Sequence, residues 1–172
     1  MNLDEILIRP PTPDDARAMI AYMERLTSEP DNNIMFDPGQ FNYTEERERA
    51  WIANHADSDK SIFLLAQHDG RVIAITELAR LSAPTQSHVA GLGISIDRDY
   101  RRLGLGTRLM GRLLDWARAH AIKRVELKVF ARNHPAIALY AKFGFVEEGR
   151  HRMIARKQGQ FLDDLTMALL LD

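Results

Sequence analysis

The segment "YRRLGLGTRLM", residues 100–110, places two glycines and three arginines at the start of a leucine-rich run. Apolar residues at helical spacing predict a helix over 104–120, carried by Leu105, Leu109, Leu113 and Trp116. Glycines let the backbone turn tightly and approach a ligand. The N–H groups of a first helical turn lack internal partners and favour an anion. The segment therefore predicts either a phosphate-binding loop or a glycine-rich helix start with solvated arginines.

Two common phosphate-binding patterns do not match this loop. A P-loop requires G-x-x-x-x-G-K-[ST], and the sequence has no such spacing. A dinucleotide fingerprint requires a third glycine three residues after Gly106, where this chain has Leu109. The G-x-G pattern by itself leaves both interpretations open.

Composition narrows the class of protein. The chain has 172 residues, so we expect one domain over 1–172, and its net charge of -1 argues against a nucleic-acid partner. It has no cysteine, which excludes disulfides, thiolate metal sites and a cysteine nucleophile, and its six histidines show no metal-ligand spacing. We expect no membrane partner and a cytoplasmic location, because no signal-like or spanning segment is present.

The order of the other elements predicts a mixed sheet flanked by helices. Strands are expected at 5–9, 61–67, 71–80, 88–97 and 124–130, and a closing hairpin at 145–156 and 161–171. Helices are expected from Thr12 to about Leu26, over 45–56, and from about 134 to Gly144. The charged "EERER" at 45–49 is typical of a solvated helix face. Residues 27–43 form the one long irregular segment, which favours a functional loop.

The run "GISIDRDYRRLGLGTRLMGRLLDWA" resembles motif A of the Gcn5-related N-acetyltransferases, [RQ]-x-x-G-x-[GA], through Arg101, Gly104 and Gly106. The downstream "VELKVFARNHPAIALYAKFGFVEEG" is similar to the family's next block, with an asparagine, a Leu-Tyr pair and Gly-Phe. The resemblance covers about 88–149 and is closest to the ribosomal-protein, polyamine and amino-acid acetyltransferase-like branch.

This resemblance implies an α/β fold (α+β by some schemes): a mixed, mostly antiparallel sheet of about seven strands, four flanking helices, and central parallel strands that splay apart. It implies acetyl-CoA as co-substrate and no metal. Ile94, Ser95 and Ile96 fall where the backbone pairs with the pantetheine arm. The other implied cofactor-binding residues are Arg101, Arg102, Leu103, Gly104, Leu105, Gly106, Thr107, Asn133 and Ala136.

The resemblance also implies that Tyr140 is the general acid in direct amine attack on the thioester, within a ternary complex; the alternative role is a core tyrosine. Some relatives have a glutamate five residues before the asparagine, where this chain has Lys128. We therefore expect water to carry the amine proton, with Glu77, Glu126 and His88 as weaker alternatives.

The implied function is N-acetylation of a primary amine: a small amine, an amino acid or a protein N-terminus. The alternative is a non-catalytic acyl-CoA-binding module of the same fold. Residues 27–43 and the closing hairpin are expected to form the acceptor pocket. Phe36, Phe41 and Tyr43 would line it or anchor the loop, and Asp31, Asp37 and Glu45 are candidates to attract a cationic amine. Family members often form homodimers, and the sequence leaves the oligomeric state open.

Overall fold

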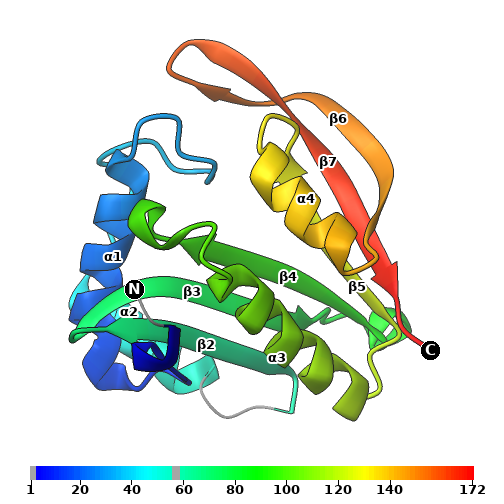
Figure 1. The fold of residues 1–172 in the computed structure, drawn as a ribbon, viewed down its shortest axis with the longest axis horizontal. Coiled ribbons are helices and arrows are strands. Elements are labelled where there is room, and N and C mark those ends of the chain that lie inside the picture. The colour runs from blue at the N-terminus through cyan, green and yellow to red at the C-terminus, as the bar shows by residue number, and fades with distance from the viewer. Residues whose placement is uncertain (1–2, 56–58) are drawn as a thin grey trace.

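The computed structural model describes residues 3–55 and 59–172, which form a seven-stranded mixed sheet in the order β1-β2-β3-β4-β5-β7-β6 (Figure 1). β4 and β5 are parallel, and the other neighbouring strands are antiparallel. The strands are β1 (Leu7–Arg9), β2 (Ser61–His68), β3 (Arg71–Arg80), β4 (Val89–Ile96), β5 (Arg124–Phe130), β6 (Val146–Lys157) and β7 (Gln160–Leu170). This confirms the expected sheet.

Four α-helices cover the two faces of the sheet: α1 (Ala16–Ser28), α2 (Glu45–His55), α3 (Leu105–Ala119) and α4 (His134–Lys142). Alternation along β2 separates two cores. Leu64 and Ala66 join the core formed with α3, whereas Phe63 and Leu65 join the core formed with α1 and α2. Figure 1 shows α3 and α4 in front of the sheet. Residues of these two helices join the first core, and residues of α1 and α2 join the second, so the two pairs of helices lie on opposite faces.

The expected boundaries hold within a few residues. The first strand is shorter than 5–9, because Leu3–Glu5 forms a 3₁₀ turn before β1. Short 3₁₀ turns also occur at Pro13–Asp15, Pro84–Gln86 and Arg98–Tyr100. Helix α2 ends at His55, and Ala56, the last residue expected in it, lies outside the described residues.

The β2–β3 hairpin turns at Asp69 and Gly70, both with positive φ (48° and 74°), as the Asp-Gly pair predicts.

The parallel β4–β5 ladder is short. It joins Val89 to Arg124, Ala90 to Val125 and Gly91 to Glu126, and then the strands diverge. β4 stays paired to β3 as far as Ile96, and β5 stays paired to β7 as far as Phe130. The backbone of β4 beyond Gly91 therefore has no strand partner on its β5 side, which leaves a wedge in the sheet.

Within the described residues, no helix has both the length and the apolar character needed to cross a membrane.

Two positions on α3, Leu113 and Gly111, give opposite predictions for the stability of the protein. Leu113 is fully buried, so Leu113→Ala should lower the free energy of unfolding by about 2–5 kcal/mol. A Cβ added at Gly111 meets nothing within 4 Å, so Gly111→Ala should raise it by about 0.5–1 kcal/mol through better helix propensity. Urea unfolding of both variants measures this, and a destabilised Gly111→Ala would contradict the open environment assigned to that position.

Candidate active site

Two cavities of about 880 Å³ and 360 Å³ meet where β4 and β5 diverge. They share lining residues from the 27–43 loop, from β4 and from α4: Asn33, Ile34, Ile94, Ser95, Asn133 and Tyr140. The smaller cavity extends toward the start of α3, and the larger one toward α1 and α2. The wedge in the sheet therefore joins a site at the glycine loop to a second site across the sheet.

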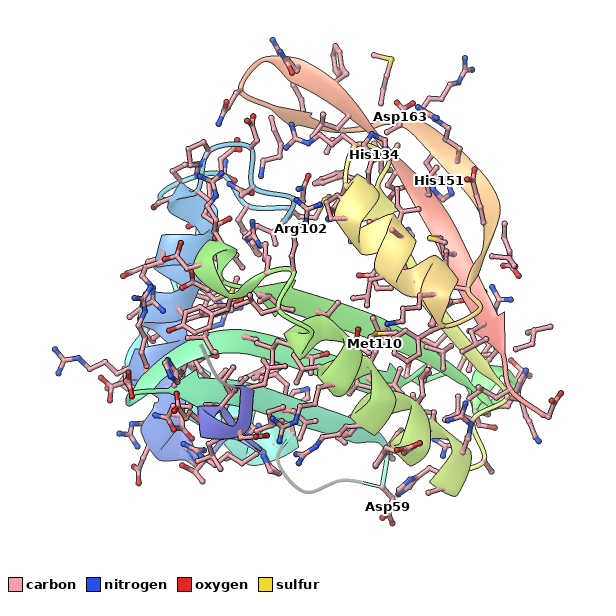
Figure 2. The ribbon with its side chains drawn as sticks, viewed as in Figure 1. Asp59, Arg102, Met110, His134, His151 and Asp163 are labelled. Atoms are coloured by element: carbon pink, nitrogen blue, oxygen red, sulfur yellow. The ribbon has the colours of Figure 1, made fainter. Side chains whose placement is uncertain are left out.

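The glycine loop has the geometry expected of an anion site. Gly104 adopts φ 92°, a left-handed conformation that disfavours other residues, and directly precedes α3. A Cβ at Gly106 would lie 2.9 Å from Leu139 Cδ2, so α4 packs closely against this position. The N–H groups of the first turn of α3 lie beside the smaller cavity. Exposed Arg102 also lines that cavity, and Figure 2 shows it between the starts of α3 and α4.

Most of the residues predicted to bind the cofactor line the smaller cavity: Ile94, Ser95, Ile96, Arg101, Arg102, Gly104, Gly106, Thr107, Asn133 and Ala136. Leu103 and Leu105 are not among its lining residues. Leu105 is 1% exposed and packs in the core, while Leu103 is exposed.

The side chains of Arg101 and Ser95 are already engaged by protein groups. Arg101 forms an ion pair with Glu29 at 2.5 Å and donates to the Ile96 carbonyl at 2.8 Å. Ser95 accepts a hydrogen bond from the buried Tyr22 hydroxyl at 2.9 Å. Arg101 thus fixes the loop against α1, and Ser95, whose backbone faces β3, is held through its side chain by Tyr22 of α1.

Asn133, at the start of α4, and Tyr140, within the helix, line both cavities. Asn133 caps the helix by accepting from the Ala136 N–H at 3.4 Å. Tyr140 is 5% exposed, and burial raises the pKa of its phenol to about 12. The phenol is therefore protonated at neutral pH, held at the boundary of both cavities.

Aromatic side chains line the larger cavity. Phe36, Phe41 and Tyr43 all line it, and they also contact one another, with centroid separations of 5.8 Å and 4.5 Å. The first of the two roles expected of these residues, lining the cavity, is thus present. Trp51 of α2 and Phe63 of β2, which the sequence did not single out, complete this surface at 4.9 Å from each other.

The acidic residues of the larger cavity differ from those expected. Among the described residues its lining includes Glu48, Glu77 and Asp164, and does not include Asp31, Asp37 or Glu45. Asp37 and Glu45 pair instead with Lys157 and Arg49. The prediction of a solvated "EERER" face was wrong at Glu48, which is 6% exposed, because that turn of α2 faces the cavity.

The candidate proton acceptors occupy different places. Glu77 lines the larger cavity from β3, makes no hydrogen bond or ion pair with another described residue, and burial raises the pKa of its carboxyl. Glu126 pairs with Arg124 at 3.0 Å, and His88 is exposed; neither lines either of these two cavities. Asp164 also lines the cavity, but His151 engages it at 2.7 Å.

Two cations face the larger cavity. Lys128, which replaces the glutamate of some relatives, lines it from β5. Exposed Arg47 of α2 lines it as well, with its guanidinium 4.2 Å from the centre of the Tyr43 ring. Within the described residues there is no cluster of side chains suited to hold a metal ion.

Comparison with known proteins agrees with this geometry. The sequence pattern of the acetyltransferase (GNAT) family matches residues 21–145. The L-amino acid N-acetyltransferase AaaT of Escherichia coli is 34% identical over 122 residues, which cover 69% of this chain and 74% of that protein.

Two solved structures extend the likeness to almost the whole chain. An acetyltransferase of the GNAT family from Streptococcus pneumoniae has a TM-score of 0.90 and 33% identity, covering 97% of this chain and 100% of that one. A putative acetyltransferase from Salmonella typhimurium, solved with its cofactor acetyl-CoA, has a TM-score of 0.83 at 20% identity, covering 98% and 95%; at that identity it supports the fold alone.

The half-buried Glu77 gives a test by pH. Its raised pKa means that the folded protein binds this proton more tightly than the unfolded chain does, so stability falls as pH rises through the window between the ordinary and the raised pKa. Glu77→Gln removes that loss. We expect the variant to be more stable than the parent at pH 7–8 and equally stable below about pH 4, where both forms are uncharged.

Thermal unfolding between pH 3.5 and 8 measures this difference, with exposed Glu46→Gln on α2 as the control. A constant difference at every pH would show that Glu77 is not the group responsible.

Proposed function

Because the chain belongs to the acetyltransferase (GNAT) family, we propose that it transfers the acetyl group of acetyl-CoA to the primary amine of a free amino acid with a large apolar side chain. We propose further that residues 1–172 act as a single N-acetyltransferase domain. The observation that carries the proposal is the convergence of the glycine loop, Tyr140 and an aromatic cavity at the wedge between β4 and β5.

The residues around the smaller cavity fit acetyl-CoA. The first turn of α3 and Arg102 suit its pyrophosphate, since unpaired N–H groups and a guanidinium both favour phosphate oxygens. The backbone of Ile94 and Ile96 faces the unpaired side of β4, where peptide-like amides of the pantetheine arm can add as a strand adds to a sheet. Acetyl-CoA supplies the activated acetyl thioester.

Tyr140 is assigned the role of general acid. The amine attacks the acetyl carbonyl, the carbon–sulfur bond breaks, and the phenol gives its proton to the departing sulfur. With a pKa of about 12 the phenol is in its protonated form at neutral pH, as a proton donor must be. Its place on the lining of both cavities supports contact with the reacting atoms.

The attacking amine must lose a proton. We assign this transfer to water in the larger cavity, with Glu77 as the group that finally receives the proton. Its carboxylate has no cationic partner within ion-pair distance among the described residues, and its raised pKa brings its basicity closer to that of an amine.

The acceptor class is inferred from the larger cavity. Phe36, Phe41, Trp51 and Phe63 suit a large apolar side chain, and Arg47 and Lys128 offer charge-assisted donors for an α-carboxylate. The relative from Escherichia coli is an L-amino acid N-acetyltransferase by name, which supports the same class.

Loss of the phenol tests the general acid. Tyr140→Phe keeps the buried ring and removes the proton, so kcat should fall about 10²–10⁴-fold with little change in acetyl-CoA binding. Thiol release at saturating substrates and calorimetry measure the two quantities. Phe143→Leu, at the end of the same helix, is the control. Unchanged turnover in Tyr140→Phe would remove this residue from the chemistry.

An acceptor panel tests the proposed function. Burying a large apolar side chain should raise kcat/KM about 10–100-fold for phenylalanine, methionine or leucine over glycine. Phenethylamine, which lacks the carboxylate, should be poorer than phenylalanine, and Arg47→Met or Lys128→Met should reduce that difference. Mass spectrometry of the acetylated products measures each rate.

Equal rates for glycine and phenylalanine would contradict the role of the aromatic surface. Tight acetyl-CoA binding without transfer to any amine would favour the alternative, a non-catalytic acyl-CoA-binding module.

A further inference from the structure

Lys157, the last residue of β6, is a buried cation. It is 6% exposed, and burial lowers the pKa of its ammonium. A buried lysine is costly unless its three N–H groups find acceptors. The acceptors of these N–H groups therefore show which segment of the fold Lys157 stabilises.

All of its near partners lie in one short segment after α1. The ammonium donates to the carbonyls of Ile34 at 2.7 Å and Phe36 at 2.9 Å, and to the side-chain oxygen of Asn32. The carboxylate of Asp37 lies 3.7 Å away. One side chain from the closing hairpin thus donates to two backbone carbonyls and one side chain of a loop about 120 residues earlier.

A second cation holds the same segment from another element. Arg132, between β5 and α4, donates to the Asn32 carbonyl at 2.9 Å and to the Asn33 side chain at 3.1 Å. Glu29, just before the segment, is the partner of Arg101 in the glycine-loop region. The segment is therefore tied to both sides of the wedge.

This segment also forms the boundary of the two cavities. Asn33 and Ile34 line both of them, and Met35 and Phe36 line the larger one. Met35 is 65% exposed, so apolar packing alone does not fix the segment. The polar contacts of Lys157 and Arg132 supply the restraint.

We propose that Lys157 is a positioning residue: its ammonium holds Asn32–Phe36 across the junction of the two cavities and so sets the KM for the amine acceptor. This rests on the proposed function in assigning the larger cavity to the amine. Without the restraint, a smaller fraction of the molecules holds Asn32–Phe36 in its binding position. The apparent affinity for the amine falls in proportion to that fraction. Saturating amine restores the arrangement, so turnover at saturation is preserved.

Lys157→Met tests this, because it keeps the length of the side chain and removes the donors. We expect KM for the amine to rise about tenfold, KM for acetyl-CoA to rise less than about threefold, and kcat to stay within about twofold. Lys142→Met, at the exposed end of α4, is the matched control and should change none of these.

Hydrogen exchange gives a readout that does not depend on activity. Amides of residues 29–37 should exchange about tenfold faster in Lys157→Met than in the parent, while those of α3 keep their rates. If Lys157→Met does not fold, Arg132→Met replaces it, with the same pattern expected and a smaller rise in KM.

Two results would overturn the proposal: parental exchange rates over 29–37, or a fall in kcat with KM for the amine unchanged. If no amine is acetylated by the parent, the proposed function fails, and the exchange comparison still tests the contacts of Lys157.

Discussion

The divergence of β4 and β5 is the constraint on which the rest of this structure depends. On its other side β4 stays paired with β3 along its length, and β5 stays paired with β7. The ladder between β4 and β5 ends at Gly91 and Glu126. A buried strand edge without partners is costly unless a ligand or water satisfies it. The fold places its two cavities there, and the start of α3 and the N-terminal part of α4 approach them from one face.

The two faces of the sheet supply different chemistry to that wedge. On the α3 and α4 face the groups include the first turn of α3, Arg102 and the Tyr140 phenol, which suit phosphate and a leaving sulfur. On the α1 and α2 face they are aromatic rings with a few charges, which suit an apolar amine. Reactants held on opposite sides of one sheet meet only where the sheet is open, which favours direct transfer in a ternary complex.

Long-range polar contacts hold the acceptor side together. The 27–43 loop has little regular structure and carries exposed Met35, yet Lys157 and Arg132 donate to its carbonyls at Asn32, Ile34 and Phe36. Backbone groups in such a loop need partners, and here they come from the distant end of the chain. The closing hairpin thus contributes to the site through a cation as well as through its wall residues Ile154 and Asp164.

Local patterns in the sequence determined the elements and the glycine loop. These patterns depend on residues close together in the sequence, so they can be recognised without the structure. They are the helical spacing of apolar residues, the Asp69-Gly70 turn, and the spacing of Arg101, Gly104 and Gly106. The structure has the turn at Asp69-Gly70 and places Gly104 directly before α3. Tertiary structure decided the rest, because burial and pairing between distant residues leave no local pattern.

Glu48 belongs to a charged helix yet faces a cavity, Arg101 pairs with Glu29, and Lys157 binds a loop about 120 residues away. Of the acids considered for the acceptor side, the chain folds Glu77 onto the cavity wall and directs Asp37 to Lys157. Which charges meet the substrate is set by packing across the sheet, a property that no single segment carries.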